Sequence, residues 1–357
     1  MKLRHLFLGS VLMALSATAQ NSEEPISLRT MGSLMYGGSV TEMPDGSTFH
    51  GDHGYAQYYI PTEAHTYPII MWHGIGQSGK CYETTYDGRE GFQAILPRRH
   101  WATYIVDQPR RGRAGYTLSK VDTSDAPPTI LSERAVWEAF RNGTWREGEE
   151  MKFYDNVQIA RDSLSIDQFY RQQTPDTGEE PRTKETRDFH GRTMASLLEK
   201  TGPAILITHS NSGQYGWSTA MNAPEGALKA IVAYEPGACA FPVSDAPTDT
   251  LASQIALCND TQAPQLVSDE EFEKLTKFPI IIVFGDNVAT EESDNFNSEV
   301  WRVAKRRARQ FVETVNRHGG DAQLLVLPEI GIYGNTHAAF SDLNNLQIAD
   351  LLEKFPA

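Results

Sequence analysis

The sequence is poor in cysteine, in net positive charge and in long apolar runs. Its 357 residues include 3 cysteines, and none of these stand in the Cys-x-x-Cys spacing typical of zinc sites. The formal net charge of −14 at pH 7 opposes nonspecific binding of nucleic acid, which needs a basic surface. Beyond the N-terminal segment, no apolar run is long enough to cross a bilayer. We therefore expect no metal site, no nucleic-acid partner and no membrane span.

The N-terminal segment has the pattern of a secretory signal peptide. Lys2 and Arg4 form a basic start, residues 6–15 form an apolar middle, and Ala17-Thr18-Ala19 supplies the small residues of a cleavage site. This pattern predicts cleavage after Ala19 and a secreted or periplasmic mature chain, residues 20–357.

Export would permit a disulfide bond. Of the three cysteines, Cys239 and Cys258 fall in one segment, so they are the favoured pair, and Cys81 is left over. Closing such a loop would contribute about 3 kcal/mol in the loop-entropy description.

Short apolar runs alternate with helical patterns along most of the chain. The runs expected as strands are 55–61, 67–74, 101–108, 203–210, 228–237, 278–286 and 322–329, and the expected helices are 91–100, 191–200, 214–221, 297–319 and 343–355. Strands that alternate with helices predict an α/β domain, with a mainly parallel central sheet and helices on both faces.

Two connections are too long for a simple alternation of strand and helix. Residues 114–190 are polar with modest apolar patterning, and residues 238–277 form a second long segment. Long segments inside a compact domain are commonly functional. We expect both to be lid insertions over the C-terminal edge of the sheet in a single domain, although plain surface insertions would also fit the pattern.

One strand ends in a polar turn that has the setting of a nucleophile elbow. The apolar run 204–208 leads into His209-Ser210-Asn211-Ser212-Gly213 and then into a helix. A sharp strand-to-helix turn needs small residues two positions either side of the nucleophile. Ser210 meets this better than Ser212, whose flank on one side is the bulky Gln214. The match departs from Gly-x-Ser-x-Gly at both glycines, so an ordinary polar loop remains an alternative.

A nucleophilic serine needs a base and a carboxylate that orients the base. The base is expected in a loop after the last strand, and His337 is the histidine at that place. Two carboxylates end neighbouring strands, Glu235 after 228–234 and Asp286 after 278–285. Both give the chain order serine, acid, histidine, and the pattern alone does not choose between them.

An oxyanion site needs two backbone N–H donors. One is expected from Asn211, the residue after the nucleophile, and the other from Ile75 in the turn His73-Gly74-Ile75-Gly76. The glycines on either side of Ile75 would let the backbone turn toward a substrate.

Together these motifs resemble the α/β-hydrolase superfamily from about Tyr55 to Phe355. The stretches WHGIGQSGKCYETTYDGREGF, YIVDQPRRGRAG, ITHSNSGQYG, AYEPG and GNTHAAFSDLNNLQIAD are similar to one group in it, the secreted bacterial esterases with a Ser-Glu-His triad. The resemblance implies the α/β-hydrolase fold, with Ser210 as nucleophile, Glu235 as acid and His337 as base. Some members of the group have adjacent cysteines in the oxyanion loop, where this chain has Ile75-Gly76.

The sequence thus predicts a secreted serine hydrolase that cleaves small-molecule carboxylic esters through an acyl-enzyme, without a cofactor. Two alternatives remain open at this point. The same fold could support a serine amidase or peptidase, because the elbow does not distinguish an ester from an amide. It could also serve as a binding protein in which the triad is vestigial.

Overall fold

The computed structural model describes residues 24–117, 131–173, 180–249 and 253–354. The expected signal peptide, residues 1–19, lies outside the described residues.

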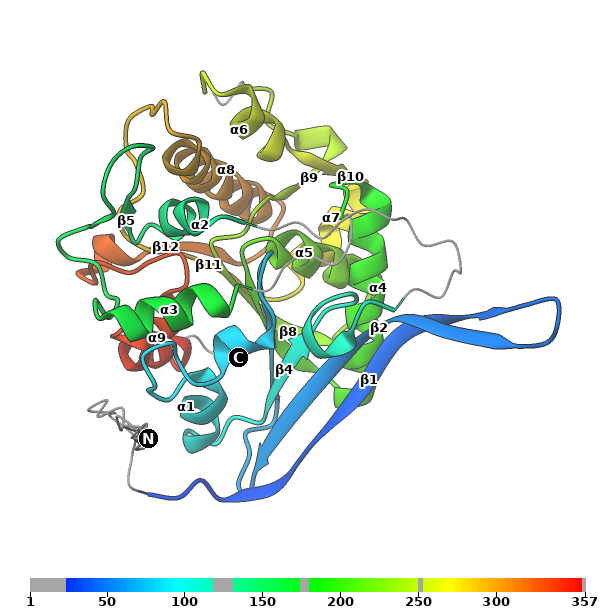
Figure 1. Cartoon of the computed structure of the whole chain (residues 1–357). Coiled ribbons are helices and arrows are strands. Elements are labelled where there is room, and N and C mark those ends of the chain that lie inside the picture. The colour runs from blue at the N-terminus through cyan, green and yellow to red at the C-terminus, as the bar shows by residue number, and fades with distance from the viewer. Residues whose placement is uncertain (1–23, 118–130, 174–179, 250–252, 355–357) are drawn as a thin grey trace, which may run out of the picture.

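A mainly parallel sheet runs through the centre of the molecule (Figure 1). Within the described residues its eight strands lie in the spatial order β1 (Leu28–Glu42), β2 (Thr48–Pro61), β4 (Thr103–Asp107), β3 (Ile69–Trp72), β7 (Ala204–His209), β8 (Leu228–Tyr234), β11 (Ile280–Phe284) and β12 (Ala322–Val326). Strands β1 and β2 are antiparallel to their neighbours, and the others pair in parallel. The expected α/β class with a mainly parallel sheet is confirmed.

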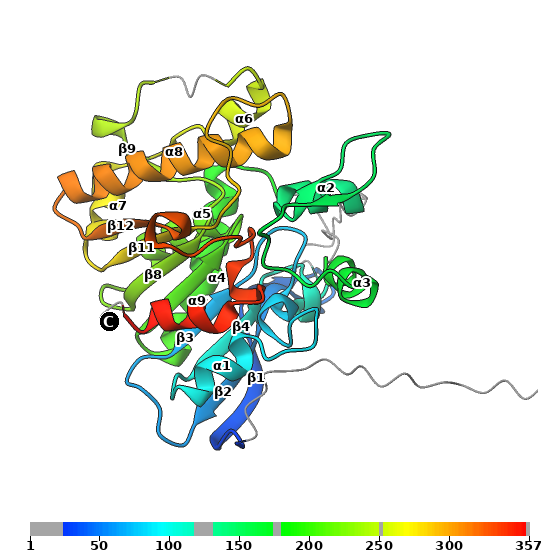
Figure 2. The same ribbon diagram turned by 90° about the vertical axis from the view of Figure 1, so that its left-hand side faces the viewer.

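Helices cover both faces of this sheet (Figure 2). The core helices are α1 (Phe92–Arg98), α4 (Lys184–Thr201), α5 (Ser212–Asn222), α8 (Phe296–Arg317) and α9 (Asn345–Leu352). Short 3₁₀ turns lie at η1 (Gly79–Tyr82), η2 (Gly112–Ala114), η3 (Val243–Asp245), η4 (Lys274–Thr276), η5 (Leu327–Ile330) and η6 (Ala339–Ser341).

The strands are apolar on both sides because both sides are covered. Within β3, Ile70 and Trp72 pack into the core under α4, α5 and α8, whereas Ile69 and Met71 pack into the core under α1 and α9. This division follows from the two-residue period of a strand. Burying such a side chain contributes about 1.5 to 3 kcal/mol. The sheet is therefore a rigid platform for whatever its strand ends carry.

Strand β1 was not expected from the sequence. The region before residue 52 is rich in glycine and polar residues, yet Leu28–Glu42 pairs with β2 over most of its length. Its side chains are mostly exposed, and Tyr36 is the fully buried one among them. Figure 1 shows the ribbon of β1 and β2 reaching beyond the rest of the molecule. A half-exposed edge strand with glycines lacks the apolar run that revealed the other strands.

The first long segment carries its own short elements. They are α2 (Glu133–Ala139), β5 (Gly143–Thr144), β6 (Lys152–Phe153) and α3 (Ser163–Arg171). Trp137 and Phe153 pack edge to face, with ring centroids 4.9 Å apart, and both belong to the core under α1 and α9. The segment therefore packs on the main body through its aromatic residues. Helix α4 begins earlier than the expected helix 191–200, because Thr183 caps it by accepting a hydrogen bond from Thr186 N–H.

The second long segment packs on helices. It contains β9 (Ala240–Pro242), α6 (Ala256–Thr261), β10 (Gln265–Val267) and α7 (Asp269–Glu273). Gln265 donates to Gln214 of α5 at 2.9 Å, and Arg307 of α8 donates to the carbonyl of Gln262 at 2.9 Å. These contacts place it against α5 and α8.

The favoured disulfide is not formed in this structure. Cys239, Cys258 and Cys81 are separate buried thiols. Cys239 lies in the large core under α4, α5 and α8, whereas Cys258 packs with Val303 in a separate small cluster. Proximity in sequence misled the prediction, because the intervening chain leads the two side chains into different clusters.

Candidate active site

Ser210 lies on a strained turn directly after β7. Its φ of +54° is in the left-handed region that residues with a side chain rarely adopt. The turn is held by backbone bonds: Ser210 N–H donates to the carbonyl of Tyr234 (2.9 Å), and Gly213 and Gly237 N–H donate to the Ser210 carbonyl (3.0 and 2.8 Å). This is the geometry that a nucleophile elbow requires.

The neighbouring Ser212 has a structural role. It is fully buried, and its hydroxyl accepts from His209 N–H at 2.9 Å. The same hydroxyl lies 3.1 Å from the carbonyl of Trp72. Ser212 therefore ties the start of α5 to β3 and β7, and Ser210 is the candidate nucleophile of the two.

The loop after β12 brings His337 to Glu235. The imidazole Nδ1 lies 2.5 Å from Oε2 of Glu235, and both residues are buried, with exposed fractions of 3% and 1%. Because the carboxylate accepts, Nδ1 carries the hydrogen of this bond and Nε2 is left as the possible base. The pair comes from residues 102 positions apart. The sequence predicted both residues as parts of the site, but not the distance between them.

The carboxylate of Glu235 is bound on every side. Glu235 has a φ of +45° at the end of β8, and its Oε1 accepts from Gly285 N–H at 2.7 Å. Arg141 forms a two-pronged ion pair with both oxygens. Burial by itself raises the pKa of Glu235, but Arg141 and His337 outweigh it and lower the pKa to about 2. Glu235 is therefore ionised at neutral pH.

Burial lowers the pKa of His337. The hydrogen bond to Glu235 and the charge of that carboxylate raise it in part, whereas the charge of Arg141 lowers it further. The net pKa lies below the ordinary value of 6.5. The ring is packed between aromatic groups, with the Trp301 ring centroid at 4.1 Å and the Phe140 centroid at 5.2 Å. His337 is thus neutral at pH 7 and able to accept a proton.

Asp286, the other candidate acid, forms hydrogen bonds with loop residues, and the structure records none with the imidazole. Its Oδ2 accepts from Gly334 N–H at 2.7 Å and from Asn156 Nδ2 at 2.8 Å. Its Oδ1 accepts from Asn287 N–H. The partly exposed carboxylate therefore joins three loops, while the neighbouring Glu235 meets the imidazole.

The histidine loop is held by residues that the sequence did not single out. Asp342 accepts from Thr336 N–H at 2.7 Å and from the Thr336 hydroxyl at 2.8 Å. His209, the last residue of β7, donates from Nε2 to the carbonyl of His337 at 3.0 Å and so ties this loop to β7. His337 N–H donates to the carbonyl of Phe140, in the first long segment, at 3.0 Å. No local sequence signal marks His209 and Phe140 as partners of this loop, because both lie far from it in the chain.

The turn after β3 packs directly on the nucleophile. A Cβ added to Gly74 would meet Ser210 Cβ and His209 Nδ1, each at 2.9 Å, so only glycine permits this approach. His73 holds the turn in place, because its Nδ1 bonds the carbonyl of Gly74 at 2.8 Å and its Nε2 accepts from Gln108 N–H. Ile75, one of the two expected oxyanion donors, follows Gly74 in this turn.

The side chain of Asn211, the other expected donor, is fixed by a polar network. Its Nδ2 donates to Glu180 Oε2 at 3.2 Å, and its Oδ1 accepts from Gln214 at 2.6 Å. Glu180 is also paired with the buried Arg111 at 2.6 Å. The network links the far end of the first long segment to the nucleophile turn. Glu180 was not foreseen, because it stands in a polar stretch without periodicity.

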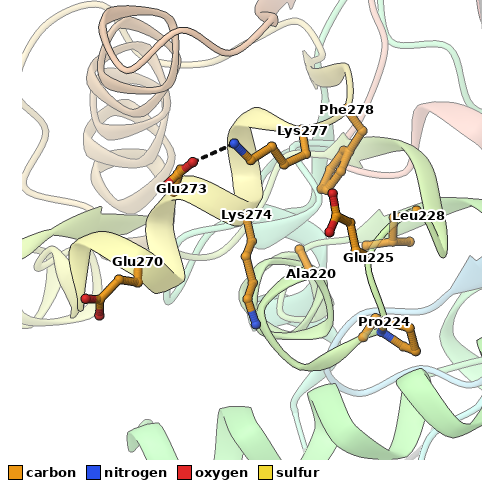
Figure 3. A pocket seen from close by; sticks show the side chains of 11 residues that line it. Ala220, Pro224, Glu225, Leu228, Glu270, Glu273, Lys274, Lys277 and Phe278 are labelled. Carbon is orange, nitrogen blue, oxygen red and sulfur yellow. Dashed lines mark hydrogen bonds and ion pairs between the residues drawn. The ribbon is translucent and has the colours of Figure 1, made fainter.

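A separate hollow of about 380 Å³ lies beside the N-terminal end of β8, and Figure 3 shows the side chains that line it. It is lined in part by Leu228, the first residue of β8, and by Ala220 near the end of α5. Lys277 is paired with Glu273, and Lys274 donates to the carbonyl of Met221, so both cations in it have partners. The hollow and Glu235 lie at opposite ends of β8.

The described residues include no helix long and apolar enough to cross a membrane. In the same part of the chain, no group of three or more potential metal ligands is found.

The chain is similar to known proteins named as an esterase and a lipase. No family model matches the chain. A solved bacterial esterase is 28% identical and superposes with a TM-score of 0.73, covering 94% of this chain and 97% of its own. The chain has the α/β-hydrolase fold. A fungal protein named "Probable secreted lipase phiG" is 26% identical over 332 residues, which cover 84% of each sequence. The expected resemblance to esterases of this fold is therefore confirmed across nearly the whole chain.

Proposed function

We propose that this α/β-hydrolase is a serine hydrolase that cleaves carboxylic esters through an acyl-enzyme intermediate. One observation carries the proposal: His337 makes a buried bond of 2.5 Å to Glu235, and both residues adjoin the strained turn of Ser210. Ser210 N–H donates to the carbonyl of Tyr234, the residue before Glu235, and the ring of His209, the residue before Ser210, lies 4.4 Å from the His337 ring. The esterase and the lipase named above are the relatives that support an ester as the substrate.

In the first half-reaction, His337 Nε2 takes the hydroxyl proton of Ser210 while Oγ attacks the ester carbonyl. The carbonyl electron pair moves to oxygen and forms a tetrahedral oxyanion. When this intermediate collapses, the bond to the alcohol oxygen breaks, and the imidazolium returns its proton to the departing alcohol. Glu235 stabilises the imidazolium and keeps its Nδ1–H in place through the hydrogen bond between the two residues.

In the second half-reaction, His337 takes a proton from water, and the hydroxide oxygen attacks the acyl carbon. Collapse breaks the bond to Ser210 Oγ, which regains the proton, and the free acid leaves. Every proton and electron pair is supplied by the chain, the ester and water, so we propose no cofactor.

The N–H groups of Ile75 and Asn211 are proposed to hold the oxyanion. They stand on the two turns that meet at Ser210, after β3 and after β7. A donor of this kind contributes about 3 to 4 kcal/mol in the transition state.

Replacing Ser210 tests this function. Ser210→Ala should reduce hydrolysis of a short p-nitrophenyl ester by about 10⁶-fold and leave the melting temperature nearly unchanged. A fluorophosphonate probe should label the wild-type chain and not the variant, which separates an enzyme from a protein that only binds. Turnover or labelling that survives in Ser210→Ala would remove Ser210 from the mechanism.

We further propose that residues 1–19 direct export and are removed after Ala19. The pattern of the segment and the name of the secreted fungal relative support this. Mass spectrometry of the exported protein should find Gln20 at its N-terminus, and an intact Met1 in the exported form would contradict the proposal.

The mature chain, residues 20–357, is proposed to be one catalytic domain, with lid insertions at about 114–190 and 238–277. The bond from His337 to Phe140 supports this lid role for the first segment.

A further inference from the structure

Arg141 lies at a sharp corner of the first long segment. It follows α2 with a φ of +56°, and its side chain is 2% exposed. An arginine is rarely buried to this degree unless it is paired. A left-handed backbone at a bulky residue also costs free energy, which the surroundings must offset. Both costs must therefore be offset by the contacts that the Arg141 side chain makes.

The guanidinium of Arg141 joins the two carboxylate strand ends. Nη1 donates to Glu235 Oε2 at 2.8 Å, and Nη2 donates to Oε1. Nε donates to the carbonyl of Asp286 at 2.8 Å. The guanidinium also lies over the Trp301 ring, 5.7 Å from its centroid, and the same ring packs on His337. Arg141 thus contacts the acid directly and the histidine through one shared neighbour.

Resting on the function proposed above, we propose that Arg141 is a positioning residue for the triad. Its planar fork fixes the Glu235 carboxylate in the orientation that meets His337 Nδ1, and its charge offsets that of the carboxylate. Lysine could supply the charge but not the two parallel bonds. The first long segment would then complete the active site as well as cover it.

This position has a consequence for the protonation of His337. A positive charge beside a buried Glu–His pair opposes the binding of a further proton, so it keeps the base neutral at lower pH. The other titratable groups near the pair are Lys305 on α8, Asp286 after β11, Asp342 below the histidine loop and His209 on β7. Burial and the charge of His337 lower the pKa of His209 well below its usual value, so it contributes no charge.

The test compares Arg141→Met, Arg141→Lys and a matched control, Arg307→Met. Arg307 is also 2% exposed and paired, but with Asp249 on the far side of α8. Ester hydrolysis is measured as kcat and KM across pH, and folding is measured by thermal melting.

In Arg141→Met we expect kcat to fall by about 10²-fold with little change in KM, because the acid is no longer oriented. The acid limb of kcat/KM should move up by on the order of one pH unit, because the opposing charge is gone. Arg141→Lys should return this limb toward the wild-type position and keep a reduced kcat. Arg307→Met should melt earlier and leave both the limb and kcat unchanged.

A double-variant cycle covers the case in which Arg141→Met does not fold. Glu235→Gln leaves a buried cation without its partner, and adding Arg141→Met removes that cation as well. If Arg141 acts through Glu235, the second change should cost no further turnover and should raise the melting temperature. A further large loss of turnover in the double variant would overturn the proposal.

The same shift should be visible in an NMR titration of the His337 imidazole, which does not depend on turnover. A folded Arg141→Met variant with the wild-type limb and titration would overturn the role of Arg141 and leave the serine mechanism intact. Activity that survives Ser210→Ala would instead overturn the serine mechanism, so the two failures are distinct.

Discussion

Strands β8 and β11 lie side by side, and each is followed at its C-terminal end by a carboxylate with different surroundings. Glu235 is buried, binds Arg141, Gly285 and His337, and has its pKa lowered to about 2. Asp286 is partly exposed and binds loop groups of Asn156 and Gly334. The comparison teaches that the place of a carboxylate in the chain order does not make it a catalytic acid. The features that set Glu235 apart, and that support it as the proposed acid, are its burial, its countercharge and its hydrogen bond to the imidazole.

The largest expected effect separates the two carboxylates by turnover. Glu235→Gln should lower kcat by about 10⁴-fold, because the imidazole loses the partner that fixes its tautomer. Asp286→Asn should lower kcat by less than about tenfold, because that carboxylate does not touch the imidazole. Both are measured on one p-nitrophenyl ester at pH 7. The opposite ranking would make Asp286 the acid.

The next effect concerns stability in acid. The pKa of Glu235 is lowered in the folded protein from 4.5 to about 2, so its ionised form stabilises the fold above pH 4.5, and this stabilisation is lost as pH falls toward 2. The difference in unfolding free energy between wild type and Glu235→Gln should therefore shrink by on the order of 3 kcal/mol over that range. Urea unfolding at a series of pH values measures this difference. A constant difference would show that the ion pair does not hold the proton off Glu235.

The smallest effect belongs to Asp286. Asp286→Asn should lower the unfolding free energy by about 1 to 2 kcal/mol at pH 7, because the carboxylate joins loops through Gly334 and Asn156. Asp167→Asn is the control, since Asp167 makes an exposed pair with Arg171 and should cost less than about 0.5 kcal/mol. Equal losses in the two variants would mean that the loop contacts of Asp286 contribute no more than a surface ion pair.

The parts of the fold that could be predicted from sequence are those with a local signal. Buried strands such as β7 and β11 are short apolar runs, and α8 has a clear amphipathic period. All three elements were predicted at nearly their observed bounds. Strand β1 lacked such a run and was missed. The pairing of Cys239 with Cys258 was wrong, because chain proximity says nothing about which cluster each thiol enters.

The candidate site divides in the same way. Ser210 could be chosen because a sharp turn restricts its flanking residues to small ones, and His337 because the fold order places a base after the last strand. Arg141, Asp342 and Glu180 had no such signal. Arg141 and Glu180 matter through contacts made across a long separation in the chain, whereas Asp342 bonds the nearby Thr336 in a loop that has no periodic pattern.

The sequence by itself determined the alternation of strands and helices, the serine on its turn and the short set of residues that could serve it. Only the tertiary structure decided which carboxylate meets the imidazole and that an arginine from the first long segment binds that carboxylate. The physical reason is that apolar periodicity and turn chemistry act between near neighbours in the chain. Burial, countercharge and hydrogen-bond distance exist only once distant segments have packed together.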